Sequence, residues 1–363
     1  MNSNNDNSSR KAYLDATKGI LISLVVLGHN YFFSRFFVEW FSFLYNFHVA
    51  CFLLFSFLLR YEELSVDSYV TRVFRALVPQ FVFLILVIPT YYVMFVSGLP
   101  EETGKWFSRL PLALTLQTET QLDMVTGFRH FWFLPAMTLL VSLLWILDGN
   151  RARAASILVF SLVLWHLYAG ELNASLFQYF PWGAALVGFI FVPGLIARKI
   201  YNWPELCWEH FPIHRDLLLF SAWLVCAWIV MRYRLFMPLA GDPDGLVSGL
   251  AKPGRLLFHD LFLLVSFFTI LRLGWWLRKT FLVSLGRESL KIFLLSPLVW
   301  QLFWLMGGRN LEAGTYFEKS ISVLITYIGT LAVSYWLAKL IAGTPLQSIM
   351  FPRTPADWRT LRR

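Results

Sequence analysis

Apolar runs long enough to cross a lipid bilayer recur along the whole of this 363-residue chain. A helix needs roughly 20 mostly apolar residues to span the hydrocarbon core of a membrane. We therefore expect an all-α fold, a polytopic transmembrane bundle of about ten helices with no separate soluble domain. The expected helices lie near residues 12–33, 38–59, 73–97, 131–147, 154–171, 179–200, 216–237, 256–276, 281–306 and 321–342.

The composition agrees with a lipid environment. Hydrophobic residues make up 57% of the chain and charged residues 15%, and the mean hydropathy is +0.58, which is far more apolar than soluble proteins are. We divide the sequence into a disordered polar N-terminus over residues 1–9, a membrane domain over 10–345 and a basic tail over 346–363. Three cysteines occur, none in a CxxC pair, so we expect no disulfide and no bound metal.

The net charge of +9 is spread over short loops instead of forming one patch. This pattern is typical of the positive-inside rule and argues against a nucleic-acid partner. An even number of helices puts both chain ends on one side of the membrane, and the larger share of the basic residues falls on that side. We therefore predict that both termini are cytoplasmic.

Ionisable residues inside the first apolar run need an explanation, because each costs about 3 kcal/mol at the bilayer centre unless it is paired or faces water. Asp15 and Lys18 are three residues apart on one helical face and can neutralise each other. His29 lies about 21 Å further along a straight helix, so neither of them can be its partner. Gly28 permits close approach of another backbone or a ligand. His29 is either a structural histidine satisfied by a serine or a carbonyl, or a functional group, which we favour.

Arg72 and Arg75 share a face at the start of the third run. Two guanidinium groups at this spacing can bind phosphates bidentately. The alternative is that both contact lipid headgroups and mark topology, and the two interpretations stand level.

Taken together, several short motifs resemble the membrane acyltransferase 3 family, in particular its branch of fucose 4-O-acetylase-like proteins that O-acetylate polysaccharides. The motifs follow the family order over residues 15 to 294. They are DATKG at 15–19, GH at 28–29, FHVACF at 47–52, RVFR at 72–75, FWFLPA at 131–136 and LGRESLKIFL at 285–294. Two positions depart from the family pattern: Phe57 replaces a frequent glycine, and Ser296 with Pro297 replaces a frequent histidine.

The resemblance implies that His29 is the catalytic histidine and that Arg72 and Arg75 bind an acyl-CoA donor, most simply acetyl-CoA, from the cytoplasmic side. It implies a carbohydrate acceptor, either an exopolysaccharide, an O-antigen or a glycolipid, and a place in a bacterial inner membrane. No other cofactor is expected, and the oligomeric state is open. Supporting site residues would be drawn from Asp15, Lys18, Asn30, His48 and Trp132.

Two other functions remain open at this point. Kinked helices and buried charges also suit a transporter or flippase for a polysaccharide intermediate. A catalytically silent family member is the third possibility, given the departures at Phe57 and Ser296.

Overall fold

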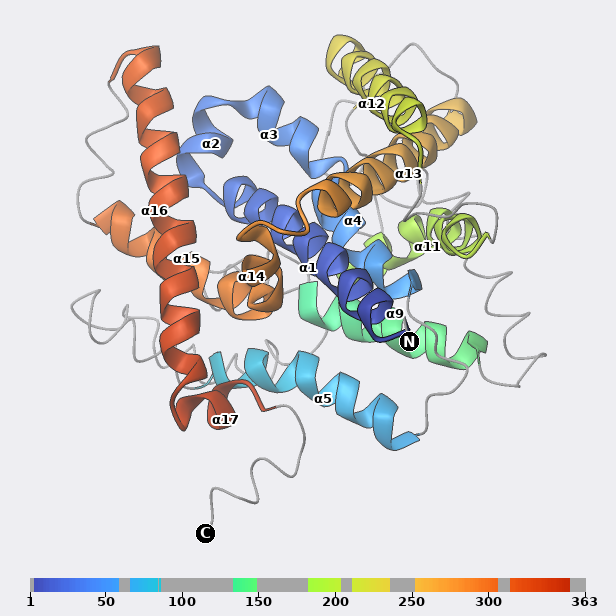
Figure 1. Ribbon diagram of the computed structural model, residues 1–363. Helices are drawn as coiled ribbons and strands as arrows, with labels where there is room; N and C mark the ends of the chain where they lie inside the picture. Colours follow the sequence, from blue (N-terminus) through green and yellow to red (C-terminus); the bar gives the residue numbers. More distant parts are fainter. Residues whose placement is uncertain are drawn as a thin grey trace. The chain divides into compact units, whose positions relative to one another are not determined.

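The computed structural model describes residues 3–58, 66–83, 85, 133–148, 182–203, 211–235, 252–305 and 314–352. All regular secondary structure in these ranges is helical, as Figure 1 shows and as the sequence predicts. The elements are α1 (Ser3–Gly28), α2 (Tyr31–Phe36), α3 (Val38–Tyr45), α4 (His48–Leu54), η1 (Phe55–Leu58), α5 (Val66–Val82), α9 (Phe133–Asp148), α11 (Trp182–Tyr201), α12 (Ile213–Tyr233), α13 (Lys252–Trp276), α14 (Leu282–Arg287), α15 (Ser289–Leu305), α16 (Tyr316–Ala342) and α17 (Leu346–Met350).

The chain forms two compact units, each considered by itself below. Unit 1 comprises Met1–Phe55 and Pro193–Lys339, and unit 2 comprises Ser56–Val192 and Leu340–Arg363. The expected run at 154–171 lies outside the described residues, and the count of about ten membrane helices stays a prediction. The first helix begins at Ser3 and so includes most of the N-terminal tract that we expected to be disordered.

Three of the expected helices are interrupted inside the apolar run. The first ends at Gly28, and the chain starts a new helix, α2, after Asn30. Asn30 is extended, with φ −74° and ψ 115°, and its side-chain oxygen accepts a hydrogen bond from the backbone N–H of Phe33 at 3.2 Å. This is an N-cap, which favours a helix start at the next residue. The prediction of one helix over 12–33 is therefore wrong at its end.

The second and ninth runs are divided in the same way. The second consists of α3, α4 and η1, and the ninth of α14 and α15, which meet at Glu288. Hydrophobicity averaged over about 20 residues does not reveal such breaks, because the few polar residues at a turn change the average little.

Four stretches among the described residues are long and apolar enough to cross a membrane, namely 38–58, 213–233, 257–276 and 316–342. Two of them, in α12 and α16, expose most of their apolar side chains, among them Leu218, Trp228, Ile325 and Trp336. An outer helix in lipid is expected to expose such a face. The stretches 38–58 and 257–276 are mostly buried, and the first lies in unit 1 up to Phe55 and the second wholly in unit 1.

Helix α1 is the centre of unit 1 and packs against α14 and α13 (Figure 1). Three glycines allow the close approach: Gly19 lies against the backbone of Leu282, Gly286 against the carbonyl of Asp15, and Gly274 against the side chain of Thr17. Any side chain at these positions would overlap its neighbour. Close helix contact through small residues is the common way for membrane helices to associate.

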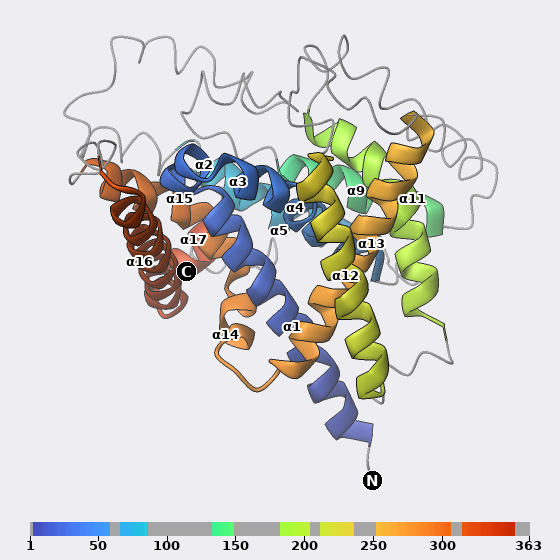
Figure 2. The ribbon, with the colours of Figure 1, turned by 90° about the horizontal axis from the view of Figure 1, so that it is seen from above.

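Helices α12 and α13 lie side by side and run in opposite directions (Figure 2). Asp216, early in α12, bonds Arg272 late in α13, while the Trp223 indole donates to the Ser266 hydroxyl further along, at 3.1 Å. Because the two helices are antiparallel, the start of α12 and the end of α13 lie at the same end of unit 1. Arg215 and Arg278 accordingly lie at one end of unit 1 and Arg234 at the other.

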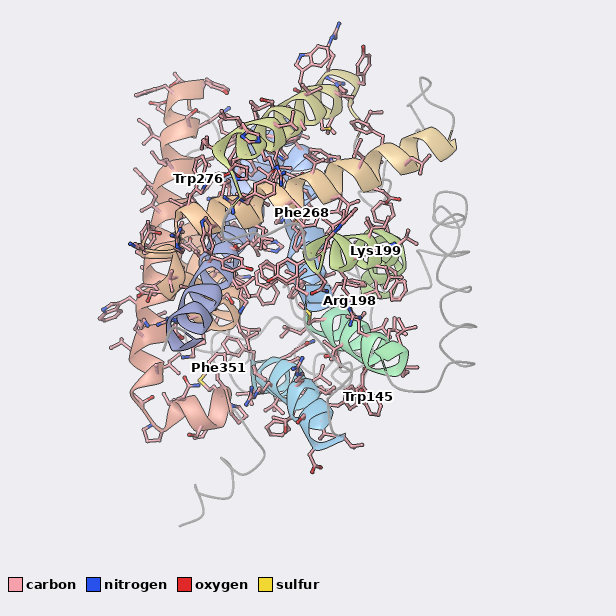
Figure 3. The ribbon with its side chains drawn as sticks, turned by 45° about the vertical axis from the view of Figure 1, so that its right-hand side comes forward. Trp145, Arg198, Lys199, Phe268, Trp276 and Phe351 are labelled. Atoms are coloured by element: carbon pink, nitrogen blue, oxygen red, sulfur yellow. The ribbon has the colours of Figure 1, made fainter. Side chains whose placement is uncertain are left out.

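In unit 2, α5 packs against α9 and α17. The Tyr69 ring stacks on Trp145 with centroids 4.4 Å apart, and its hydroxyl lies 2.8 Å from that of Ser142. Phe351, after α17, contacts Phe83 at 6.0 Å. Figure 3 labels Trp145 and Phe351, the two aromatic residues that join α9 and α17 to the segment around α5.

Candidate active site

His29 lies directly after the last residue of α1, at the break before α2, and is half-buried. Its Nδ1 atom is 3.3 Å from the phenol oxygen of Tyr45, and the two rings meet edge to face with centroids 6.3 Å apart. As the sequence requires, this contact involves neither Asp15 nor Lys18. It comes from a tyrosine at the end of α3, a residue that the sequence analysis did not consider.

A second imidazole, that of His48, lies on the other side of Tyr45 with ring centroids 4.8 Å apart. His48 is fully buried, and its Nδ1 is 2.7 Å from the carbonyl oxygen of Leu44. Gly28 makes room for this arrangement, because a methyl carbon there would lie 3.0 Å from His48 Nε2 and 3.3 Å from the Tyr45 ring. The groups close to Gly28 are two side chains and not the backbone or ligand that the sequence analysis considered. We call His29, Tyr45 and His48 the histidine end of unit 1.

Asn30 lies in the same region, and its side chain caps α2 and bonds to α16. Its oxygen caps α2, and its amide nitrogen donates to the Thr326 hydroxyl at 2.9 Å and to the Val323 carbonyl at 3.4 Å. Both bonds reach α16, so Asn30 ties the break in the chain to that helix. Of the supporting residues expected from sequence, Asn30 and His48 lie next to His29 or its tyrosine partner.

Asp15 and Lys18 form the predicted ion pair, with Lys18 Nζ 3.3 Å from Asp15 Oδ1. Asp15 also pairs with Arg287 at 3.4 Å, and the adjacent Glu288 pairs with Lys291 at 2.8 Å and Lys339 at 3.1 Å. We call this region, together with the Asp216–Arg272 pair, the charged end of unit 1. The start of α1 and the last turns of α16 therefore lie at the same end of the unit. That this end faces the cytoplasm stays a prediction.

The Asp216–Arg272 pair was missed by our sequence analysis. The Arg272 guanidinium bonds both carboxylate oxygens of Asp216, at 2.6 and 2.8 Å, and the Trp276 indole donates to the same carboxylate at 3.0 Å (Trp276 is labelled in Figure 3). Both charged residues are buried. The signal was present, because Arg272 is an ionisable residue inside an apolar run, the same criterion that singled out His29.

Arg72 and Arg75 lie in α5 of unit 2, Arg72 half-buried and Arg75 exposed. They share one helix face, as predicted from their spacing. His29 belongs to unit 1, so the structure describes the proposed donor-binding pair and the proposed catalytic histidine as parts of different units. Trp132, the remaining supporting residue, lies outside the described residues.

The two positions that depart from the family pattern, Ser296 and Phe57, both make internal contacts. Pro297 lies inside α15 and has no N–H to donate to the carbonyl four residues earlier, that of Phe293. The Ser296 hydroxyl donates to that carbonyl at 3.4 Å, which is how a membrane helix tolerates a proline. Phe57 is fully buried in unit 2 and packs edge-on against Phe191 with centroids 5.7 Å apart.

These observations define a helical membrane protein with a polar, histidine-containing region inside it. The profile of the acyltransferase domain of the acyltransferase 3 family matches residues 11–339, which is most of the chain. The protein belongs to this family and is an acyltransferase. No curated protein and no solved structure matches the chain. The four apolar stretches and the family together indicate an integral membrane protein.

Proposed function

We propose that this protein is an O-acyltransferase that moves an acyl group, most simply acetyl, from a cytoplasmic acyl-CoA to a sugar hydroxyl of a surface or lipid-linked polysaccharide. The acceptor would be an exopolysaccharide, an O-antigen or a glycolipid, as in the fucose 4-O-acetylase-like branch of the family, and the enzyme would lie in a bacterial inner membrane. The family match supports acyl transfer and gives no support to the transporter alternative.

The observation that carries the proposal is the placement of His29. It is a half-buried imidazole directly after α1, whose last ten residues are apolar apart from Ser23, and a tyrosine contacts one of its two ring nitrogens. An imidazole held through one nitrogen can transfer a proton through the other. We therefore assign the chemistry to Nε2.

In the proposed reaction, Nε2 removes the proton of the acceptor hydroxyl as its oxygen attacks the thioester carbonyl carbon. The new carbon–oxygen bond forms, the carbon–sulfur bond of the donor breaks, and the imidazolium returns the proton to the leaving thiolate. The products are the sugar ester and free CoA. A second route, in which Nε2 first carries the acyl group and the sugar hydroxyl then displaces it, gives the same products.

Arg72 and Arg75 are the proposed donor-binding residues. Their common face on α5 suits bidentate contact with the phosphates of CoA. Replacing both with alanine is expected to weaken CoA binding to the purified protein, and lysine is expected to substitute poorly, because an ammonium lacks the planar fork. CoA binding that is unchanged in the double alanine variant would leave these arginines as topology markers.

The decisive variant is His29→Ala. Loss of a general base typically lowers a rate by about 10² to 10⁴-fold, while alanine at this position removes a polar group that lipid disfavours, so insertion should be retained. The quantity to measure is glycan acylation per monodisperse, detergent-solubilised protein. His214→Ala, in the exposed first turn of α12, is the control and should retain activity. Near-normal turnover of His29→Ala would refute the catalytic assignment.

Mass spectrometry of surface glycans tests the function in cells. With the gene present, the polysaccharide should carry one additional acetyl mass per modified unit, and without it the unmodified polymer should still reach the surface. Unmodified glycan that is retained inside cells lacking the gene would instead identify a transporter.

A further inference from the structure

Tyr45 lies between the two imidazoles of the histidine end. Its hydroxyl contacts Nδ1 of His29 at 3.3 Å, and its ring meets that of His48 edge to face at 4.8 Å. His29 comes directly after α1, Tyr45 ends α3, and His48 begins α4. Three separate helix ends therefore meet at one tyrosine.

The position of Tyr45 is fixed by its packing. The Phe41 ring lies 4.4 Å from it, one helical turn earlier in α3. The imidazole of His48 covers another side of the ring, and the missing side chain at Gly28 leaves the space that the edge of the tyrosine fills. Tyrosine has only two side-chain torsions before its hydroxyl, so packing of the ring also places the oxygen.

The hydrogen bond of His48 determines which of its nitrogens carries a proton. A carbonyl oxygen can only accept, so Nδ1 of His48 donates to Leu44, and Nε2 of the neutral ring bears the lone pair. Nε2 has no hydrogen-bond partner in the part of the chain that the structure describes, and it faces Gly28. The hydrogen bond to Leu44 fixes the His48 ring, which packs against one side of Tyr45.

The role of His29 as a general base determines which of its two ring nitrogens carries the hydrogen. For Nε2 to accept a proton from a sugar hydroxyl, the neutral ring must carry its hydrogen on Nδ1, and this hydrogen needs an acceptor. The phenol oxygen of Tyr45 is an acceptor at hydrogen-bond distance from that nitrogen.

We propose that Tyr45 is a positioning residue for His29: its phenol oxygen accepts the Nδ1–H of His29, which places the basic lone pair of the neutral ring on Nε2, while His48 and the space at Gly28 hold the tyrosine in place. The effect of Tyr45 on catalysis rests on the proposed function. The contact between Tyr45 and His29 does not depend on the reaction, so it can be tested without an activity assay.

The test compares Tyr45→Phe with Tyr13→Phe. The first keeps the ring and removes only the oxygen. The second removes a buried hydroxyl from the other end of α1, where Tyr13 and Tyr201 lie 2.6 Å apart, and is a matched control. In full-length protein with ¹⁵N-labelled histidine, the His29 signals are assigned with His29→Gln, and solid-state NMR then reports which ring nitrogen carries the proton.

We expect wild-type His29 to carry its proton on Nδ1, and Tyr45→Phe to shift the ring toward the Nε2–H form. In the transfer assay, Tyr45→Phe should lower kcat by about tenfold or more with KM for donor and acceptor unchanged, as positioning loss predicts. Tyr13→Phe should change neither the NMR signals nor kcat per folded molecule.

A wild-type His29 protonated on Nε2 would overturn the proposal, as would a Tyr45→Phe variant with unchanged tautomer and kcat. If the Nδ1–H form depends on Tyr45 but the wild-type protein transfers no acyl group to any glycan, the contact is upheld and the proposed function fails. The two failures are therefore distinguishable.

Discussion

Glycine and polar side chains lie at both ends of α1 in unit 1, but their contacts differ between the two ends. At the charged end, Gly19 and Gly286 bring backbone against backbone, and Asp15 and Glu288 each pair with two basic residues. At the histidine end, Gly28 faces two polar side chains, and His48 keeps a nitrogen without a hydrogen-bond partner among the described residues. We therefore expect substitutions at the charged end to act mainly on stability, and substitutions at the histidine end, where the proposed catalytic histidine lies, to act mainly on turnover.

The largest effect on stability is expected from Asp216→Ala at the charged end. It leaves the Arg272 guanidinium, 3% exposed, without its carboxylate. Removing one partner of a buried ion pair costs about 3–5 kcal/mol. Glu39→Ala is the matched control, because it breaks an exposed pair with Arg234 that is worth roughly 0–1 kcal/mol. Thermal unfolding in detergent measures both losses. Equal losses would show that the buried pair does not hold α12 to α13.

Gly286→Ala is expected to destabilise the protein by about 1–3 kcal/mol or more, because the new carbon would overlap the Asp15 carbonyl and the backbone of α1 must move away. The yield of monodisperse protein and its melting temperature check this. Specific activity of the protein that still folds should remain close to normal. A selective loss of activity with normal stability would place the charged end in the chemistry and break the comparison.

Gly28→Ala should have the smallest effect on stability and a selective effect on turnover. Its methyl group meets the tips of Tyr45 and His48, which are side chains that can shift by a few tenths of an ångström, and not backbone. We expect folding to be retained and kcat per folded molecule to fall by about tenfold as Tyr45 moves relative to His29. The same melting and transfer assays apply. Loss of folding as large as that of Gly286→Ala would show that the two ends do not differ.

Several features of the fold were predictable because they depend on local sequence. Apolar run length predicted the positions of α9, α11, α12, α13 and α16 to within a few residues. Spacing predicted the Asp15–Lys18 pair and the common face of Arg72 and Arg75. The breaks at Asn30 and Glu288 were not predicted, since the few polar residues at each turn change the average hydrophobicity of the long run only little.

The sequence by itself determined that this protein is a helical membrane protein of the acyltransferase 3 family and that His29 is an unusual residue within it. Only the tertiary structure decided what surrounds that histidine. Tyr45 reaches His29 because α1 stops at Gly28 and a second helix break, at Phe37, precedes α3. Arg272 reaches Asp216 because α12 and α13 run in opposite directions. Whether a residue is helical depends on neighbours within a few positions of the sequence. The residue that it contacts on another helix depends on where the other helices end and how they pack.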